Sequence, residues 1–136
     1  MDKLRYDMRI TEQFKIPYPK PASAKVSWNR RYGMNAYYSG KHWAQRKKDA
    51  EVWHWMTTAA MRKAQCRTTP FDKPVVVRFC WNDNLDIDNH AVMGKMIVDA
   101  MKGTIIHDDS PRYLAGVEHY FHDEDYILVM VREVDT

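Results

Sequence analysis

The pattern of apolar and polar residues predicts four β-strands. In residues 5–16 apolar side chains alternate with polar ones, and three prolines then prevent regular pairing. Residues 74–81 are rich in β-branched and aromatic side chains, which is typical of a central strand. Two more strands are expected at residues 112–121 and 126–134, with residues 122–125 as the hairpin loop between them.

Two helices are expected between these strands. The first begins near residues 39–42 and ends near residue 65, because neither proline nor glycine interrupts it. The second spans residues 89–102, with Asp88 as its N-cap and a glycine just after its last turn. Residues 23–40 are rich in Asn, Arg, Tyr and Gly and are predicted to form a loop. The order β-α-β-α-β-β predicts an α+β fold with a mixed sheet.

The length of the chain is enough for a hydrophobic core, and we expect residues 1–136 to form a single domain. No apolar run approaches the roughly 20 residues that span a bilayer, and the first residues lack an apolar signal core. A soluble, cytoplasmic protein without membrane association is therefore expected. Cys66 and Cys80 are not part of a Cys-x-x-Cys pair and are interpreted as reduced thiols without a functional role.

Charge is divided unevenly along the chain. The first 67 residues contain 15 lysines and arginines against 5 acidic residues, whereas the remaining residues contain 6 against 13. The basic half is also rich in Trp and Tyr, a mixture typical of surfaces that bind phosphates and pack against bases. The alternative is an ordinary solvated basic face. Residues of the basic half with this character are Lys41, Trp43, Arg46 and Lys47.

Three aspartates indicate a metal site in the acidic half. Asp86 and Asp88 are separated by one residue at the end of the predicted central strand, where alternation directs both side chains to one side. Asp109 follows the second predicted helix. Carboxylates repel one another unless a cation lies among them, and oxygen ligands of this kind favour Mg²⁺ or Mn²⁺ over zinc. The alternative is a set of polar turns in which Asp88 is only a helix cap.

Helical geometry places Lys95 and Asp99 on the same face of the second helix as Asp88. An ammonium group there could stabilise charge that develops on a phosphate oxygen. The alternative is a simple i,i+4 ion pair between Lys95 and Asp99. The opposite face is apolar and carries Met93, Ile97 and Met101.

Other metal and phosphate motifs are not indicated. A calcium-binding EF-hand loop that began at Asp86 would need Gly and Glu where the sequence has Ala91 and Ile97. His119-x-x-His122 is the nearest approach to a zinc motif and is interpreted as structural. Neither a Gly-x-x-x-x-Gly-Lys phosphate loop nor a Gly-x-Ser-x-Gly elbow occurs.

Three motifs in the second half of the chain are Asp86-x-Asp88-Asn89, Lys95-x-x-x-Asp99-Ala100-Met101 and Ile105-Ile106-x-Asp108-Asp109. Together they resemble the RusA-type Holliday junction resolvases of bacteria and their phages, over roughly residues 70–133. An earlier segment is similar to the amino-terminal segment of the phage members. It reads Asn35-x-Tyr37-x-x-Gly40-x-His42-Trp43-x-x-Arg46.

This resemblance implies a homodimer in which each subunit nicks one strand of a four-way DNA junction. In the family three aspartates hold magnesium and a lysine is needed for cleavage, and these match Asp86, Asp88, Asp109 and Lys95. The family lysine follows the second aspartate by four positions and Lys95 follows by seven, which keeps the helix face but moves the ammonium group about 4.5 Å along the axis. DNA contacts are expected from Asn35, Lys41, His42, Trp43, Arg46 and Lys47.

We therefore expect a magnesium-dependent endonuclease of RusA-like fold that resolves four-way DNA junctions in the cytoplasm of a bacterial host cell. The resemblance also implies products that carry a 5′-phosphate. Two alternatives stay open at this point. One is a nuclease specific for flaps or other branched DNA, and the other is a non-catalytic DNA-binding protein that holds a metal for structure alone.

Overall fold

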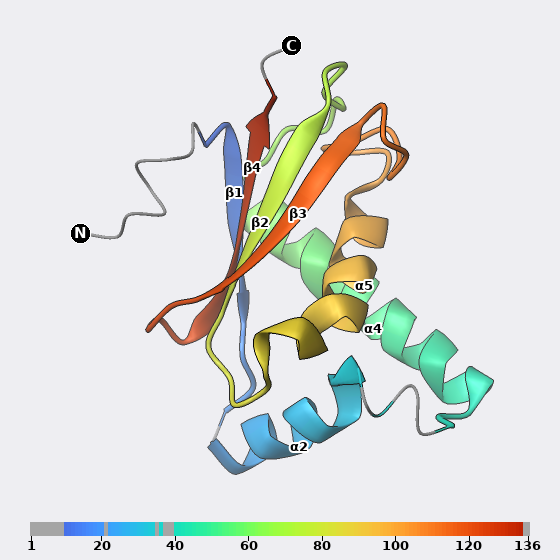
Figure 1. Ribbon diagram of the computed structural model, residues 1–136, viewed down its shortest axis with the longest axis vertical. Coiled ribbons are helices and arrows are strands. Elements are labelled where there is room, and N and C mark those ends of the chain that lie inside the picture. The colour runs from blue at the N-terminus through green and yellow to red at the C-terminus, as the bar shows by residue number, and fades with distance from the viewer. Residues whose placement is uncertain (1–9, 21, 35, 37–39, 135–136) are drawn as a thin grey trace.

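The computed structural model describes residues 10–20, 22–34, 36 and 40–134, which form a four-stranded mixed sheet with helices on one face (Figure 1). The strands are β1 (Glu12–Pro17), β2 (Val75–Trp81), β3 (Leu114–Phe121) and β4 (Tyr126–Glu133). The helices are α2 (Ala22–Tyr32), α4 (Trp43–Lys63) and α5 (Ala91–Met101), with a 3-10 helix η1 (Ile87–His90) directly before α5. The predicted α+β class and the mixed sheet in one domain are confirmed.

The sheet has the order β1-β4-β2-β3, so that β2 is an interior strand as predicted. β4 runs antiparallel to both of its neighbours, whereas β2 and β3 are parallel and are connected through η1 and α5. The predicted hairpin between β3 and β4 is wrong, because β2 lies between these two strands. The loop of residues 122–125 instead crosses the end of β2, where the backbone N–H of His122 donates to the carbonyl of Trp81 at 2.9 Å.

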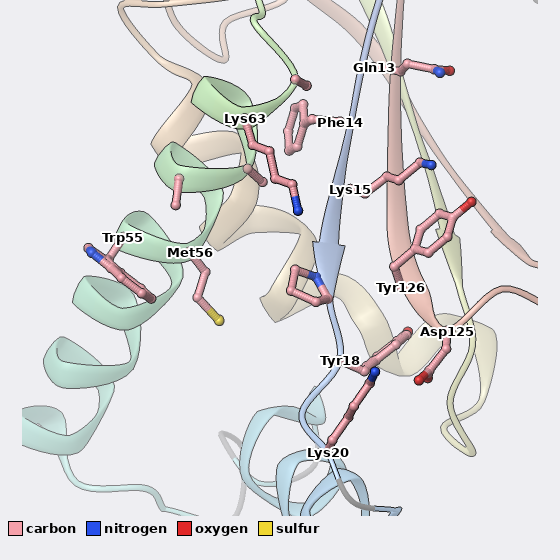
Figure 2. A pocket seen from close by; sticks show the side chains of 14 residues that line it. Gln13, Phe14, Lys15, Tyr18, Lys20, Trp55, Met56, Lys63, Asp125 and Tyr126 are labelled. Carbon is pink, nitrogen blue, oxygen red and sulfur yellow. The ribbon is translucent and has the colours of Figure 1, made fainter.

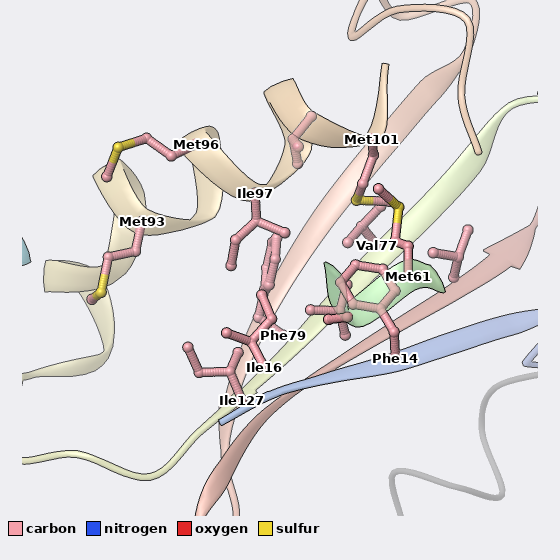
Figure 3. Packing of buried hydrophobic residues seen from close by; sticks show 14 of the residues in the cluster. Phe14, Ile16, Met61, Val77, Phe79, Met93, Met96, Ile97, Met101 and Ile127 are labelled. Carbon is pink, nitrogen blue, oxygen red and sulfur yellow. The ribbon is translucent and has the colours of Figure 1, made fainter. Parts of the chain in front are cut away.

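Alternation along the strands gives the sheet one thickly covered face and one nearly bare face. On the covered face, side chains of β1, β2 and β4 pack against α4 and α5 in the main core (Figure 3). Cys80, Leu128 and Met130 form only a small cluster on the other face. The core residues labelled in Figure 3 are Phe14, Ile16, Met61, Val77, Phe79, Met93, Met96, Ile97, Met101 and Ile127.

The prediction of a loop over residues 23–40 is wrong for its first part, which forms α2. Its composition is polar, and tertiary packing holds it in place: the ring of Trp28 lies 5.3 Å from that of Trp53 in α4, and Tyr32 lies at the same distance from Trp53. Packing of this kind overrides weak local helix propensity. The first helix is confirmed as α4, whereas residues 5–9 of the first predicted strand lie outside the described residues.

The second predicted helix is confirmed with a different start. Residues 87–90 form η1, whose N-cap is Asp86, so the prediction that Asp88 caps the helix is wrong. The helix ends before Gly103, whose φ of 83° is a conformation that glycine adopts without strain. Gly94 lets the helix approach the sheet closely, since a β-carbon at this position would lie 3.2 Å from Cε1 of His119.

Within the described residues no helix is both long and apolar enough to cross a membrane. Cys66 and Cys80 are free thiols, in agreement with the sequence-based expectation. Burial, together with the nearby charge of Glu12, raises the pKa of the Cys66 thiol to about 11. A thiol with such a pKa is protonated at neutral pH and is a poor nucleophile or metal ligand.

Candidate functional site

Asp86 and Asp88 lie shortly after the end of β2. Asp86 is the N-cap of η1, and Asp88 is a residue of η1 itself. Both side chains are exposed. Neither takes part in a hydrogen bond or an ion pair within the part of the chain that the structure describes. Two neighbouring negative charges without a cationic partner are free to bind a cation or a ligand from solution.

A buried pair of His90 and Asp83 lies next to the acidic turn that carries Asp86 and Asp88. Nε2 of His90 lies 2.8 Å from Oδ1 and 2.9 Å from Oδ2 of Asp83, and Nδ1 of His90 lies 3.0 Å from the carbonyl oxygen of Ile87. Both side chains are fully buried. Because an acceptor faces each ring nitrogen, the pair contains either an imidazolium with a carboxylate or a neutral imidazole with a carboxylic acid. In both forms the two residues fix the η1 backbone that carries the exposed aspartates.

The same pair belongs to a column of stacked rings beneath the turn. The ring of His90 lies 4.5 Å from that of Trp81, which in turn lies 5.9 Å from the ring of His119. The indole N–H of Trp81 donates to Nδ1 of His119 at 3.0 Å. Burial and the neighbouring His90 lower the pKa of His119. His119 is thus a neutral acceptor at neutral pH, and His122, which bonds the carbonyl of Tyr126, is also structural as predicted.

The lowered pKa of His119 predicts acid sensitivity of the fold. Below its ordinary value of 6.5 an unfolded imidazole takes up a proton that the folded one resists, so the free energy of unfolding should fall as the pH drops through this range. Urea unfolding at pH 7.5 and 5.5 would measure the loss. The variant His119→Gln keeps an acceptor for Trp81 but does not titrate, and it should lose less stability than the wild type over the same interval. An equal loss in both proteins would contradict this role of His119.

A second charged group lies at the other end of α5. Nζ of Lys102 lies 3.0 Å from Oδ1 of Asp99 and 3.2 Å from Oδ2 of Asp109, while Lys95 lies 3.6 Å from Asp99. The hydrogen bond from Lys102 lowers the pKa of Asp109, and the bond to Asp99 is the main cause that raises the pKa of Lys102. The i,i+4 pair between Lys95 and Asp99 therefore exists, and Lys95 also faces Asp109 electrostatically.

Asp108, next to Asp109, has a local role. Its Oδ1 accepts a hydrogen bond from the backbone N–H of Ser110 at 2.8 Å. Hydrogen bonds with the side chain and then with the backbone of Ser110 lower the pKa of the carboxyl group. Such a bond is typical of an aspartate that closes a turn. Asp109 is thus the member of this pair whose carboxylate faces the charged end of α5.

One chain does not bring the three predicted metal ligands together. Asp86 and Asp88 precede α5 and Asp109 follows it, and in Figure 1 the segments before and after α5 lie at opposite ends of the helix. With a rise of 1.5 Å per residue the two groups are about 16 Å apart along the axis. No three Asp, Glu, His or Cys side chains are arranged to hold a metal ion among the residues that the structure describes. Each group alone offers only part of an oxygen ligand set for Mg²⁺.

The basic amino-terminal half contains a buried ion-pair network around Asp49. This carboxylate is completely buried, and Oδ1 accepts hydrogen bonds from Arg31 at 2.8 Å and from Gln45 at 3.0 Å. Lys41 pairs with Oδ2 and also donates to the carbonyl of Arg31 at 2.7 Å. Lys41, one of the predicted DNA contacts, thus lies in this network and shares the single carboxylate of Asp49 with Arg31.

The other predicted DNA contacts gather at the start of α4. His42 caps the helix, with Nδ1 accepting from the backbone N–H of Ala44 at 3.2 Å, and its ring lies 5.7 Å from that of Trp43. Trp43 is 70% exposed, and the side chains of Arg46 and Lys47 are exposed on the first turns of the helix. Asn35 lies outside the described residues. The start of α4 thus presents an aromatic ring and two cations to solvent.

Two features of the site were not anticipated from the sequence. Lys102 links Asp99 to Asp109, and its spacing of three residues from Asp99 on one helix face could have indicated the pair. The Asp83–His90 pair gave no such signal, because its members are seven positions apart and do not belong to one regular helix or strand.

No protein-family model matches the sequence, and neither the curated proteins nor the solved structures include a significant match to it.

Proposed function

We propose that this protein is a magnesium-dependent endonuclease that acts on branched DNA, with four-way junctions as the main substrate and paired phosphodiester hydrolysis as the reaction. The observation that carries the proposal is the pair of exposed, unbalanced carboxylates Asp86 and Asp88 on a turn that a buried His–Asp pair holds rigid. A basic and aromatic surface at the start of α4 supports nucleic acid as the ligand.

The separation of Asp109 from Asp86 and Asp88 is resolved if two chains form the site together. In a dimer whose two-fold axis runs perpendicular to α5, the two copies of this helix lie side by side and antiparallel. Each acidic turn then lies beside the partner chain's copy of the segment that follows α5, so that Asp86 and Asp88 of one chain meet Asp109 of the other. Such a dimer contains two equivalent sites, as the symmetric cleavage of a four-way junction requires.

The side of the molecule next to α5 offers apolar surface for this dimer. β3 is an edge strand, and its Val117 and Phe121 are large apolar residues that remain exposed. Each is two positions from His119, which lies close to α5, and both therefore lie on the same face of β3 as the helix. Ile87 of η1 is exposed as well. Apolar residues that line an open sheet edge favour association with a second copy of the chain.

The residues that would hold the ion are Asp86, Asp88 and Asp109. Magnesium bound there would polarise a phosphoryl oxygen and favour attack by water. Lys95 is 69% exposed and keeps its ammonium group near Asp99, from where it can neutralise charge on a phosphate. Lys102 balances Asp109 in the single chain. The carboxylates of α5 and its flanking turns thus bind and orient, and the lysines compensate charge.

The test of this function compares three synthetic DNAs. A four-way junction, a flap and a linear duplex are incubated with the protein in Mg²⁺ and, in parallel, in EDTA. Cleavage of the junction in Mg²⁺ alone is expected, with products that carry a 5′-phosphate. If none of the three is cleaved, the enzyme proposal fails and a non-catalytic DNA-binding protein is favoured. Equal cleavage of flap and junction would favour the broader branched-DNA nuclease.

The shared site predicts that two inactive variants restore each other. Chains with Asp88→Asn and chains with Asp109→Asn carry different affinity tags, are co-expressed, and the mixed dimer is purified through both tags. One of its two sites then contains only intact aspartates, so about half of the wild-type nicking rate is expected, although each variant alone is inactive. A mixed dimer as inactive as its parents would show that each site belongs to one chain.

A further inference from the structure

A groove with apolar, aromatic and basic lining residues runs along the second half of α4, away from the start of that helix (Figure 2). It lies between the second half of α4, β1 and the turn that leads into β4, and it has a volume of about 740 Å³. Its apolar lining comes from Phe14, Pro17, Met56, Ala59, Ala60 and Ala64. A space of this size is typical of a site for a small or extended ligand.

Aromatic rings stand on both walls of this groove. Trp55 projects from α4 and is 71% exposed, whereas Trp53, two residues earlier, is completely buried in the core. Tyr126 lies on the opposite wall (Figure 2). The ring of Trp55 makes no ring–ring contact with any residue that the structure describes. An indole ring left in solvent contributes little to the core and offers a free face for stacking.

Three lysines give the groove a positive rim. Lys15, Lys20 and Lys63 line it, and none of them forms an ion pair with a carboxylate of the described residues. Lys15 lies over the ring of Tyr126 at 4.7 Å. Asp125 is the acidic residue of the lining, and it is paired with Lys25 at 3.4 Å. The groove therefore complements an anionic ligand that also has flat apolar parts.

We propose that this groove binds an unpaired strand of nucleic acid, with one base stacked on Trp55 and the flanking phosphates bound by Lys15, Lys20 and Lys63. Stacking on a single aromatic ring tolerates any base, and lysines on both walls follow the backbone of a strand that runs along the groove. Its volume of about 740 Å³ lies in the range of sites for small organic ligands, a size class that includes single nucleotides. An acidic peptide would use the lysines but would leave the Trp55 face without a planar partner.

This inference rests on the proposed function in one respect, because branched DNA is the substrate that would present unpaired nucleotides at the branch point. Its test does not depend on cleavage. Binding of a fluorescein-labelled thymidine octanucleotide is measured by fluorescence anisotropy in EDTA, over a series of salt concentrations. An octanucleotide of the same length with abasic sugars keeps the phosphates but removes the bases, and an oligoglutamate peptide represents the acidic alternative.

Trp55→Ala is expected to weaken binding of the thymidine octanucleotide about tenfold and to leave binding of the abasic octanucleotide unchanged, because only the first ligand can stack. Lys63→Ala should weaken both and reduce the salt dependence by about 0.7 in the slope of log K against log salt, as one phosphate contact is lost. Lys73→Ala is the matched control, because it removes the same charge from an exposed lysine that lies outside the groove.

The proposal is overturned if Trp55→Ala binds the thymidine octanucleotide as the wild type does, or if Lys63→Ala and Lys73→Ala weaken it equally. If Trp43→Ala loses binding of the thymidine octanucleotide and Trp55→Ala keeps it, the strand binds at the start of α4 and the proposal is also overturned. Preference for oligoglutamate would assign the groove to an acidic peptide. If the junction is not cleaved but the octanucleotide binds as expected, only the proposed function is contradicted. If the junction is cleaved but the octanucleotide does not bind in the groove, only the proposal for the groove is contradicted.

Discussion

Asp88→Asn and Asp109→Asn are each expected to reduce the rate of junction cleavage at least about 100-fold, since an ion that polarises a phosphoryl oxygen contributes several kcal/mol to the transition state. An asparagine keeps the size and one acceptor oxygen of the side chain but removes the charge that holds the metal. Cleavage is measured in a single turnover, with excess protein, a labelled four-way junction and Mg²⁺. Gel-shift binding of the same junction in EDTA should be unchanged, because the basic residues that bind phosphates are intact.

The matched control is the neighbouring variant Asp108→Asn. Asp108 accepts a hydrogen bond from the backbone of Ser110, and an asparagine side chain can accept the same bond. This variant should therefore cleave nearly as fast as the wild type. Equal losses in Asp108→Asn and Asp109→Asn would indicate that the loop matters only for folding. Loss of junction binding together with cleavage would assign Asp109 a structural role.

Elements whose signal is local were predictable from the sequence. The β-branched run before residue 82 and the uninterrupted stretch of α4 each contain their own evidence, and both elements occur within a few residues of the expected bounds. The face of α5 that carries Met93 and Ile97 is buried as the helical period requires, and Lys95 on the other face is exposed. Burial of one face and exposure of the other follow from spacing alone.

Features that depend on distant residues were not predictable. The loop after β3 has the length of a hairpin turn, yet β2 occupies the place between β3 and β4, and no local pattern records that pairing. Likewise α2 is polar and becomes a helix because Trp28 and Tyr32 find Trp53 in α4. Non-local pairing of this kind decides the sheet order, while local sequence decides only that strands exist.

The same division explains the candidate site. The sequence predicts a single metal site formed by Asp86, Asp88 and Asp109, and Asp109 follows the other two by 23 and 21 positions. The rigid body of α5 between them keeps the groups apart within one chain. The helix therefore places the predicted metal ligands in two separate groups within one chain. The proposed chemistry then requires a homodimer, in which the groups of two chains can meet.

The largest expected loss of stability comes from His90→Ala. This change leaves the carboxyl group of Asp83 completely buried without its main partner, and breaking a buried pair in this way costs about 3 to 5 kcal/mol. For a chain of this length the melting temperature should fall by roughly 10 to 20 °C. Thermal and urea unfolding, followed by circular dichroism, measure the change.

An exposed His–Asp pair provides the control for this experiment. His107 lies 3.2 Å from Asp72, and both side chains are open to solvent. His107→Ala should cost less than about 0.5 kcal/mol, because exposed ion pairs contribute little. The double variant Asp83→Ala with His90→Ala should be less destabilised than the sum of its single variants, since removal of both groups leaves no buried charge behind. A cost for His90→Ala no greater than that for His107→Ala would contradict the view that the buried pair fixes the turn bearing Asp86 and Asp88.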